Sequence, residues 1–366
     1  MKKNNSMISV SLGLTLFSML FGAGNLIFAP LLGCQAALST PAAIAGFCIT
    51  AVVLPIASIL IISCYPSASK MVSTINPVFA KVFITLVFLL VGPCIAIPRT
   101  ASTSFEMFEW LFHGDFAARV LYSTLFFTAC FFTALNPGKL KDILGKVMGP
   151  ILLAMVLILC TAVLLYPAQW SQAAASASYS SPFLKGLNEG YQTMDILAGF
   201  CFSVIMAVTF KSFGLENGQE SKSILFRAGI IAGCLLALLY TLLAGCAMKF
   251  AGQIPDASNG ARILLWMSRL CFSDFGAVFI SLIFLAACFN VCSGLLACCS
   301  QYFCTLIPKV SYKTWLIIFT LSGLVVSVQG LDWILAISAP LLSVVGPIAV
   351  LLSLWGLLYP RFRKAS

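Results

Sequence analysis

A short stretch near the start of the chain carries residue types that could hold a polar solute inside a membrane. It comprises, in order, Phe21, Gly22, Ala23, Gly24 and Asn25, and it lies within an apolar run over residues 8–32. Glycine weakens a helix by about 1 kcal/mol relative to alanine, and asparagine competes for backbone hydrogen bonds. Non-helical backbone at membrane depth is tolerated only where protein buries it or where it lines a wet cavity. The stretch therefore predicts a helix break whose amides and carbonyls bind a solute, with close packing of small residues against another helix as the alternative.

A second stretch, from Gly190 to Asp195, interrupts a later apolar run in the same way. Asp195 follows Lys185 by ten residues, which is about 15 Å along a helical path and places it near the middle of a bilayer. An ionisable side chain at that depth is expected to be functional. The alternative is a shorter outer segment, in which Thr193 and Asp195 cap a helix at the membrane interface.

The composition identifies the kind of protein that must position these residues. The 366 residues are 61% hydrophobic and only 9% charged, with a mean hydropathy of +1.04, whereas soluble domains carry about 25% charged residues. We therefore expect an all-α, polytopic membrane protein. One histidine and scattered acids provide no hydrolytic triad or metal site, so an enzyme is not expected. The scattered basic residues exclude a nucleic-acid surface.

About twenty residues cross the hydrocarbon core as a helix, and the apolar runs predict ten spans. These are 8–32, 40–62, 78–98, 118–135, 147–166, 187–210, 226–249, 274–306, 314–329 and 333–357. With the N-terminus inside, fifteen Lys and Arg residues lie on the inner side and six on the outer side. This asymmetry predicts that both termini are cytoplasmic. The first apolar run is longer than a signal-peptide core, so an uncleaved first span is expected.

Three connecting segments have their own character. Residues 98–115 are amphipathic and are expected to lie along the outer surface or to follow the third span. Residues 170–181 are rich in Ala and Ser and predict a flexible outer loop, and 259–272 predict an interfacial helix. Arg99, at the outer end of the third span, is expected to pair with Glu106 or gate the outer mouth, or else to be a snorkelling anchor.

Ten spans divide into five and five within a single transport domain over residues 1–366. The first repeat is predicted over 8–166 and the second over 187–357, with opposite topology. The unusual span is the first of each half. Interrupted segments at corresponding positions of two inverted halves indicate the binding site of a transporter.

Five stretches, spread over nearly the whole chain, resemble the branched-chain amino acid:cation symporter family, the BrnQ-like carriers. They are GLTLFSMLFGAGNLIFAPLLG (13–33), VGPCIAIPRTASTSFE (91–106), NPGKLKDILGK (136–146), EGYQTMDILAGFCFS (189–203) and PKVSYKTWLIIFTL (308–321). The resemblance implies a leucine-transporter-like fold of two inverted five-helix repeats in the bacterial cytoplasmic (inner) membrane. It also implies uptake of leucine, isoleucine and valine driven by sodium or protons, without another cofactor. Members usually carry twelve spans, against the ten expected here.

A zwitterionic substrate needs donors for its carboxylate and acceptors for its ammonium group. Backbone amides at the first break, at the positive end of a half-helix, suit the carboxylate, and carbonyls of the second break with Asp195 suit the ammonium group. The predicted substrate-binding residues are Phe21, Gly22, Ala23, Gly24, Asn25, Thr193, Met194, Asp195 and Ala198. The candidate pocket walls, for which bundle packing is the alternative, are Phe21, Cys94, Ile97, Phe200 and Phe202.

The fold that the resemblance implies commonly places its coupling ion between the first break and span eight. Asn290 and Ser293 are spaced i, i+3 and share one helix face, so their oxygens are predicted to bind sodium together with carbonyls near Gly22 and Asn25. The alternative is an interhelical hydrogen bond. The family tends to have adjacent hydroxyl residues where this chain has Asn290 and Val291, so proton coupling through Asp195 stays open. A carrier for another apolar amino acid such as methionine, a channel and any oligomeric state also stay open.

Overall fold

The computed structural model describes residues 2–112, 115–136, 147–176, 179–212 and 219–365, and within them the chain is helical without strands. The elements of the first half are α1 (Lys2–Leu20), α2 (Ala23–Ala36), α3 (Thr40–Cys48), α4 (Leu54–Ile62), α5 (Ala68–Val72), α6 (Pro77–Leu89), α7 (Ala96–Glu106), α8 (Glu109–Phe112), α9 (Phe116–Ala134) and α11 (Gly149–Leu165). Those of the second half are α12 (Pro182–Gln192), α13 (Asp195–Ser212), α14 (Gln219–Lys249), α15 (Gly260–Phe272), α16 (Asp274–Leu306), α17 (Tyr312–Ser327) and α18 (Leu331–Ala365).

Six helical stretches of the described chain are long and apolar enough to cross a membrane. They are Gly24–Ile62, Pro77–Glu106, Phe116–Ala134, Ser223–Lys249, Asp274–Leu306 and Leu331–Tyr359. Shorter apolar helices cover Asn5–Leu20, Gly149–Leu165 and Tyr312–Ser327. Each of the ten expected spans coincides with helix, and the predicted all-α membrane protein is confirmed. The repeat boundaries at 8–166 and 187–357 stay a prediction, and residues 137–146 of one expected inner loop lie outside the described part.

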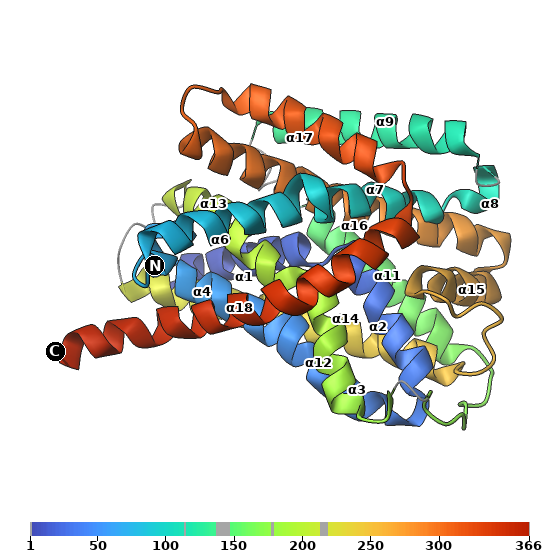
Figure 1. Cartoon of the computed structure of the whole chain (residues 1–366). Coiled ribbons are helices and arrows are strands. Elements are labelled where there is room, and N and C mark those ends of the chain that lie inside the picture. The colour runs from blue at the N-terminus through green and yellow to red at the C-terminus, as the bar shows by residue number, and fades with distance from the viewer. Residues whose placement is uncertain (1, 113–114, 137–146, 177–178, 213–218, 366) are drawn as a thin grey trace.

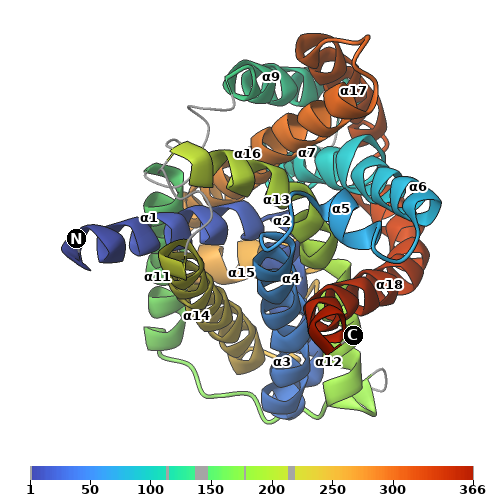
Figure 2. The same cartoon turned by 90° about the vertical axis from the view of Figure 1, so that its left-hand side faces the viewer.

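Helices α2 and α13, which begin at the two breaks, lie near the middle of the bundle, and α9, α11, α17 and α18 lie at its outside (Figures 1 and 2). Helix α14 packs along both α1 and α2, α3 packs against α12, and α16 packs against α7 and α13. Helices α9 and α17 lie side by side at one edge, and α18 runs across the outside of α4 and α12. This arrangement buries the two breaks between neighbouring helices, where their unpaired backbone groups need partners.

The third span is longer than its apolar pattern predicts. Helix α6 continues through a π-helical turn, Leu90–Cys94, into α7, with a kink at Gly92 beside Pro93. Every residue from Ala96 to Phe105 is buried, because α7 packs between α16 and α17. The prediction that this segment lies along the outer surface was therefore wrong, and the alternative, that it follows the third span, holds.

The other two connecting segments are partly as predicted. Helix α15 occupies the predicted interfacial segment, and its apolar residues Ile263, Leu264 and Met267 are buried. The described part of the outer loop at 170–181 is mostly irregular, but backbone hydrogen bonds fix it. Ser171 N–H donates to the Lys249 carbonyl at 3.0 Å and Ser176 N–H to the Gln35 carbonyl at 2.9 Å.

Lys249, at the end of α14, stabilises the fold as a buried cation rather than as an outer loop charge. Its side chain is only 2% exposed, and Nζ donates to the carbonyls of Val163, Leu164 and Tyr166 at 3.2, 2.8 and 2.7 Å. These carbonyls end α11, where a cation is favoured by the helix dipole.

We expect Lys249→Met to lower the free energy of unfolding by about 2 kcal/mol, since hydrogen bonds to a charged donor are lost inside the protein. The measurement is thermal unfolding in detergent, with Lys313→Met as the control because Lys313 is exposed. Equal melting temperatures for Lys249→Met and the control would contradict this role.

Candidate functional site

Two helix breaks meet at one cavity in the centre of the bundle. Between α1 and α2, Gly22 has extended backbone (φ −130°, ψ −165°) and no side chain caps the new helix. Between α12 and α13, Met194 has a φ of 68°, a left-handed conformation that non-glycine residues adopt rarely and that is commonest at functional sites. Residues of both breaks line a cavity of about 30 Å³. The unpaired amides and carbonyls of two helices are thus brought to one place.

The glycines of the first break are required by close contact with neighbouring segments. A Cβ atom on Gly22 would lie 2.8 Å from Cγ2 of Val291 in α16. A Cβ atom on Gly24 would lie 2.8 Å from Nη2 of Arg99 and 2.9 Å from the carbonyl oxygen of Thr193. Real Cβ atoms are essentially never this close to another atom. The first break therefore packs directly on α16, α7 and the second break.

Arg99 lies at the meeting point of the breaks and not at the outer end of a span. It is 4% exposed, and its Nη1 and Nη2 atoms each donate at 2.9 Å to the carbonyl oxygens of Gln192 and Thr193. The predictions of a pair with Glu106 and of a snorkelling anchor were wrong, because Arg99 is buried and its guanidinium bonds the second break, whereas a role in gating stays a prediction. Glu106 instead accepts from Asn259 Nδ2 at 2.7 Å and pairs with Arg262 at 3.4 Å.

Asp195 begins α13 from a buried position, with 5% of its surface exposed. Its carboxylate lies near the side chains of Thr193 and Asn25 and the charge of Arg99. Oδ2 of Asp195 and Oδ1 of Asn25 have no hydrogen-bond partner among the described residues. Asn25 uses its other atom, Nδ2, to donate to the Leu20 carbonyl at 2.6 Å. Buried acceptors without partners are costly, so these two oxygens are suited to a ligand that donates hydrogen bonds or carries positive charge.

The predicted ion ligands on α16, Asn290 and Ser293, are fully buried, and Asn290 contacts α1. Asn290 Nδ2 donates to the Ser18 carbonyl at 2.7 Å and also contacts Ser18 Oγ. This is the interhelical hydrogen bond that was the alternative interpretation. However, Oδ1 of Asn290 and Oγ of Ser293 have no partner among the described residues. The Gly22 carbonyl accepts from Leu26 N–H at a long 3.3 Å. The hydrogen bond to α1 uses only Nδ2 of Asn290. Oδ1 of Asn290 and Oγ of Ser293 are therefore free to bind an ion while this bond is kept.

Most of the predicted binding residues line the small cavity, but the predicted walls do not. Gly22, Gly24, Asn25, Thr193, Met194, Asp195 and Ala198 belong to it. Phe21 instead stacks on Phe17 and Tyr240, and nothing is described of the Ala23 side chain. Cys94, Ile97, Phe200 and Phe202 also lie outside the lining, so the alternative of bundle packing holds for Ile97 and Phe202. The lining residues that sequence reasoning did not assign to the pocket are Met19, Leu20, Ala96, Arg99, Thr100, Val291 and Leu295.

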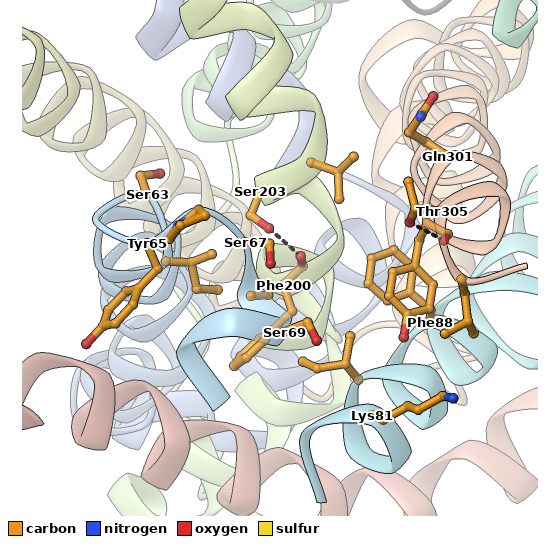
Figure 3. A pocket seen from close by; sticks show the side chains of 17 residues that line it. Ser63, Tyr65, Ser67, Ser69, Lys81, Phe88, Phe200, Ser203, Gln301 and Thr305 are labelled. Carbon is orange, nitrogen blue, oxygen red and sulfur yellow. Dashed lines mark hydrogen bonds between the residues drawn. The ribbon is translucent and has the colours of Figure 1, made fainter. Parts of the chain in front are cut away.

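A second, larger cavity of about 610 Å³ lies further along α13 (Figure 3). Phe200 and Ser203 of α13 line it from one side, and Gln301 and Thr305 of α16 from the other. Ser203 Oγ donates to the Phe200 carbonyl at 2.7 Å. Its rim includes Lys81 and the segment between α4 and α5. Ala198 lines the small cavity and Phe200 the large one, so the two cavities follow each other within about one helical turn.

On the other side of the small cavity, charged residues join α7 to the segment around α15. Besides Glu106 and Asn259, Arg262 contacts Asp256 at 2.7 Å. Hydrogen bonds from Ser258 and Arg262 lower the pKa of Asp256 to about 2. Asp256 therefore stays ionised, and this pairing is retained, throughout the physiological pH range.

The sequence of this chain is similar to those of known transport proteins. A family model described as "Branched-chain amino acid transport protein" matches residues 4–365. The chain is 34% identical to the branched-chain amino acid permease BrnQ of Bacillus subtilis (strain 168), over 99% of this chain and 83% of that protein. It is 33% identical to the branched-chain amino acid transport system 2 carrier protein of Pseudomonas aeruginosa (strain PAO1), over 94% of this chain and 79% of that protein.

Solved structures share the fold at low sequence identity. One is Mhp1, a nucleobase-cation-symport-1 family transporter in a closed conformation with bromovinylhydantoin bound, with a TM-score of 0.61 and 14% identity. Its match covers 94% of this chain and 77% of that one. Another is MhsT in complex with L-phenylalanine, with a TM-score of 0.60 and 17% identity, covering 94% and 87%. The predicted leucine-transporter-like fold is therefore confirmed.

Proposed function

The chain belongs to the branched-chain amino acid transport protein family, and we propose that it is a secondary active carrier that imports leucine, isoleucine and valine by cation symport. The observation that carries this proposal is the meeting of both helix breaks at a cavity with one buried cation, Arg99, and one buried carboxylate, Asp195. The other lining residues are small, apolar or neutral. Such a site matches a zwitterion whose side chain is aliphatic, because the described lining residues include no further charge to pair with a charged side chain.

The two cavities support alternating access as the transport mechanism. The small cavity has room for about two water molecules, far below the roughly 300–1,000 Å³ of ligand pockets, so binding requires the surrounding helices to separate. The large cavity lies on the side of the α4–α5 connection, which the chain topology places with the N-terminus. With the N-terminus in the cytoplasm, this cavity is the inner vestibule, and the Glu106–Arg262 pair closes the outer side.

The Lys and Arg distribution supports this orientation more strongly once the structure is considered. Arg99 and Lys249 were both counted as outer loop charges, but each is buried against backbone carbonyls. Removing them from the outer loops increases the excess of basic residues on the inner side, which favours cytoplasmic termini. The bacterial relatives support the cytoplasmic membrane of a bacterium as the location.

We propose sodium as the coupling ion, bound between α16 and the first break. The unpartnered oxygens of Asn290, Ser293 and Asn25 provide hard ligands, and Gly22 of the first break packs directly against Val291 of α16. Oxygen atoms of this kind suit a hard cation. The variant with Asn290→Ala and Ser293→Ala is therefore expected to raise the sodium concentration for half-maximal leucine uptake by about tenfold or more.

Val291 offers a matched gain-of-function control for the sodium site. Val291→Thr adds a hydroxyl beside Gly22 with nearly the same side-chain shape, so it is expected to lower the half-maximal sodium concentration. Both variants are measured by labelled leucine uptake into proteoliposomes at fixed pH. Uptake that ignores sodium in every variant but follows an imposed pH gradient would transfer the coupling role to Asp195 and a proton.

A further inference from the structure

We propose that Arg99 binds the α-carboxylate of the transported amino acid and thereby makes the carrier reject substrates that lack a carboxylate. The inference rests on the proposed function and names the residue responsible for its selectivity. It begins from the position of the guanidinium group, which lines the small cavity and is almost completely buried. An arginine in such a site must satisfy its donors with protein or ligand acceptors.

Two features create an anion site at this point. Helix α2 begins at Ala23 with no side chain capping it, and the amides of a first helical turn lack partners within their own helix. The guanidinium approaches the same turn, as the 2.8 Å separation between Nη2 and a Cβ atom at Gly24 shows. Helix amides and a guanidinium together favour a carboxylate, which an arginine binds through two parallel hydrogen bonds.

The guanidinium has donors left for a ligand after it has bound the protein. It has five N–H donors, and the hydrogen bonds to Gln192 and Thr193 use two of them. Those two bonds attach the group to the second break. Backbone carbonyls thus hold Arg99 beside the start of α2. Its remaining donors are available for the carboxylate of a ligand.

Acceptors at the same cavity provide for the other end of the substrate. Oδ2 of Asp195 and Oδ1 of Asn25 are buried and have no partner among the described residues, which suits an ammonium group. Arg99 supplies hydrogen-bond donors to the cavity, and Asp195 and Asn25 supply acceptors. A zwitterion matches both, whereas an amine or a carboxylic acid alone would bring an unpaired charge into a dry site, which is costly.

The test compares leucine with two analogues that each lack one charged group. Leucinamide lacks the carboxylate, and 4-methylpentanoate lacks the ammonium group. Both compete against labelled leucine in proteoliposomes containing the wild-type chain, Arg99→Gln, Arg99→Lys or the control Arg269→Gln, whose side chain is exposed. In the wild type and the control, leucinamide is expected to bind about 100-fold more weakly than leucine.

Arg99→Gln is expected to reduce this preference to about tenfold or less, mainly because leucine binds more weakly, and Arg99→Lys is expected to restore part of it. If Arg99→Gln does not transport, leucine and leucinamide binding are compared by their effect on thermal unfolding in detergent. A purely structural role would weaken both ligands equally, and an unchanged preference in Arg99→Gln would overturn the proposal. Failure of the wild type to bind or transport leucine would instead reject the proposed function.

Discussion

Gly24→Leu is expected to abolish leucine uptake while the protein still inserts into the membrane. Leucine favours a helix more than glycine does, so insertion of the first span does not suffer. The new side chain, however, enters the space held by Nη2 of Arg99 and the Thr193 carbonyl, 2.8 and 2.9 Å from its Cβ atom. It would displace the guanidinium from the second break and fill the cavity. Gly22→Leu is expected to have the same effect, because its side chain collides with Val291.

Gly245→Leu is the matched control for both variants. Gly245 lies within the membrane-spanning part of α14, and a Cβ added there would meet no neighbouring side chain or helix within 4 Å. The control should therefore transport leucine normally at equal abundance in the membrane. Initial uptake rates, divided by the amount of inserted protein, make the comparison. Wild-type rates in Gly22→Leu and Gly24→Leu would show that the first break is not part of the substrate site.

Asp195→Asn is expected to reduce uptake by about tenfold or more, as loss of a charged hydrogen-bond acceptor in a buried site predicts. Asparagine has nearly the same shape and caps a helix almost as well as aspartate. A decrease therefore reports on the charge of Asp195 and not on the start of α13. Asp115, which caps α9 and is exposed, offers the control Asp115→Asn.

Uptake measured over a range of leucine concentrations separates the possible roles of Asp195. Loss of the ammonium partner raises the half-maximal leucine concentration, whereas loss of a proton carrier removes the response to a pH gradient. Unchanged uptake in both measurements would mean that Asp195 serves only as a helix cap.

The two breaks could be predicted from the sequence because their residue types conflict with their surroundings. Glycines and Asn25 within an apolar run weaken a continuous helix. Burial of the Asp195 side chain without a partner would be costly. These conflicts are local, so they are visible without knowing the fold. The structure adds that both breaks meet at the same cavity, which residue types alone do not determine.

The position of Arg99 could not be predicted because it depends on how α7 packs. The amphipathic pattern of residues 98–115 suggested that this segment lies along the outer surface. In the structure, Thr100 and Ser102 bond the backbone, to Ile97 at 2.6 Å and to Ser327 at 2.8 Å respectively. These bonds let a polar segment enter the bundle. An arginine inside an otherwise apolar region was nevertheless a sign that it had a buried partner.

The candidate pocket walls lie outside the small cavity for a related reason. Large aromatic residues near a break were expected to surround the substrate, but Phe21 packs on Tyr240 with ring centroids 6.1 Å apart. Smaller residues from α7 and α16 line the cavity in its place. Contacts between distant parts of the chain decide which side of a helix faces the site, and an apolar run without clear periodicity gives no indication of that side.

Counterflow in proteoliposomes tests the central claim most directly. Vesicles loaded with unlabelled leucine are diluted into a trace of labelled leucine, with the Gly24→Leu variant in parallel. A carrier with its substrate site at the two breaks should accumulate label transiently above equilibrium, isoleucine and valine should suppress the accumulation, and the variant should show none. Entry of label only to equilibrium, as through a channel, or equal accumulation in the Gly24→Leu variant, would contradict the account.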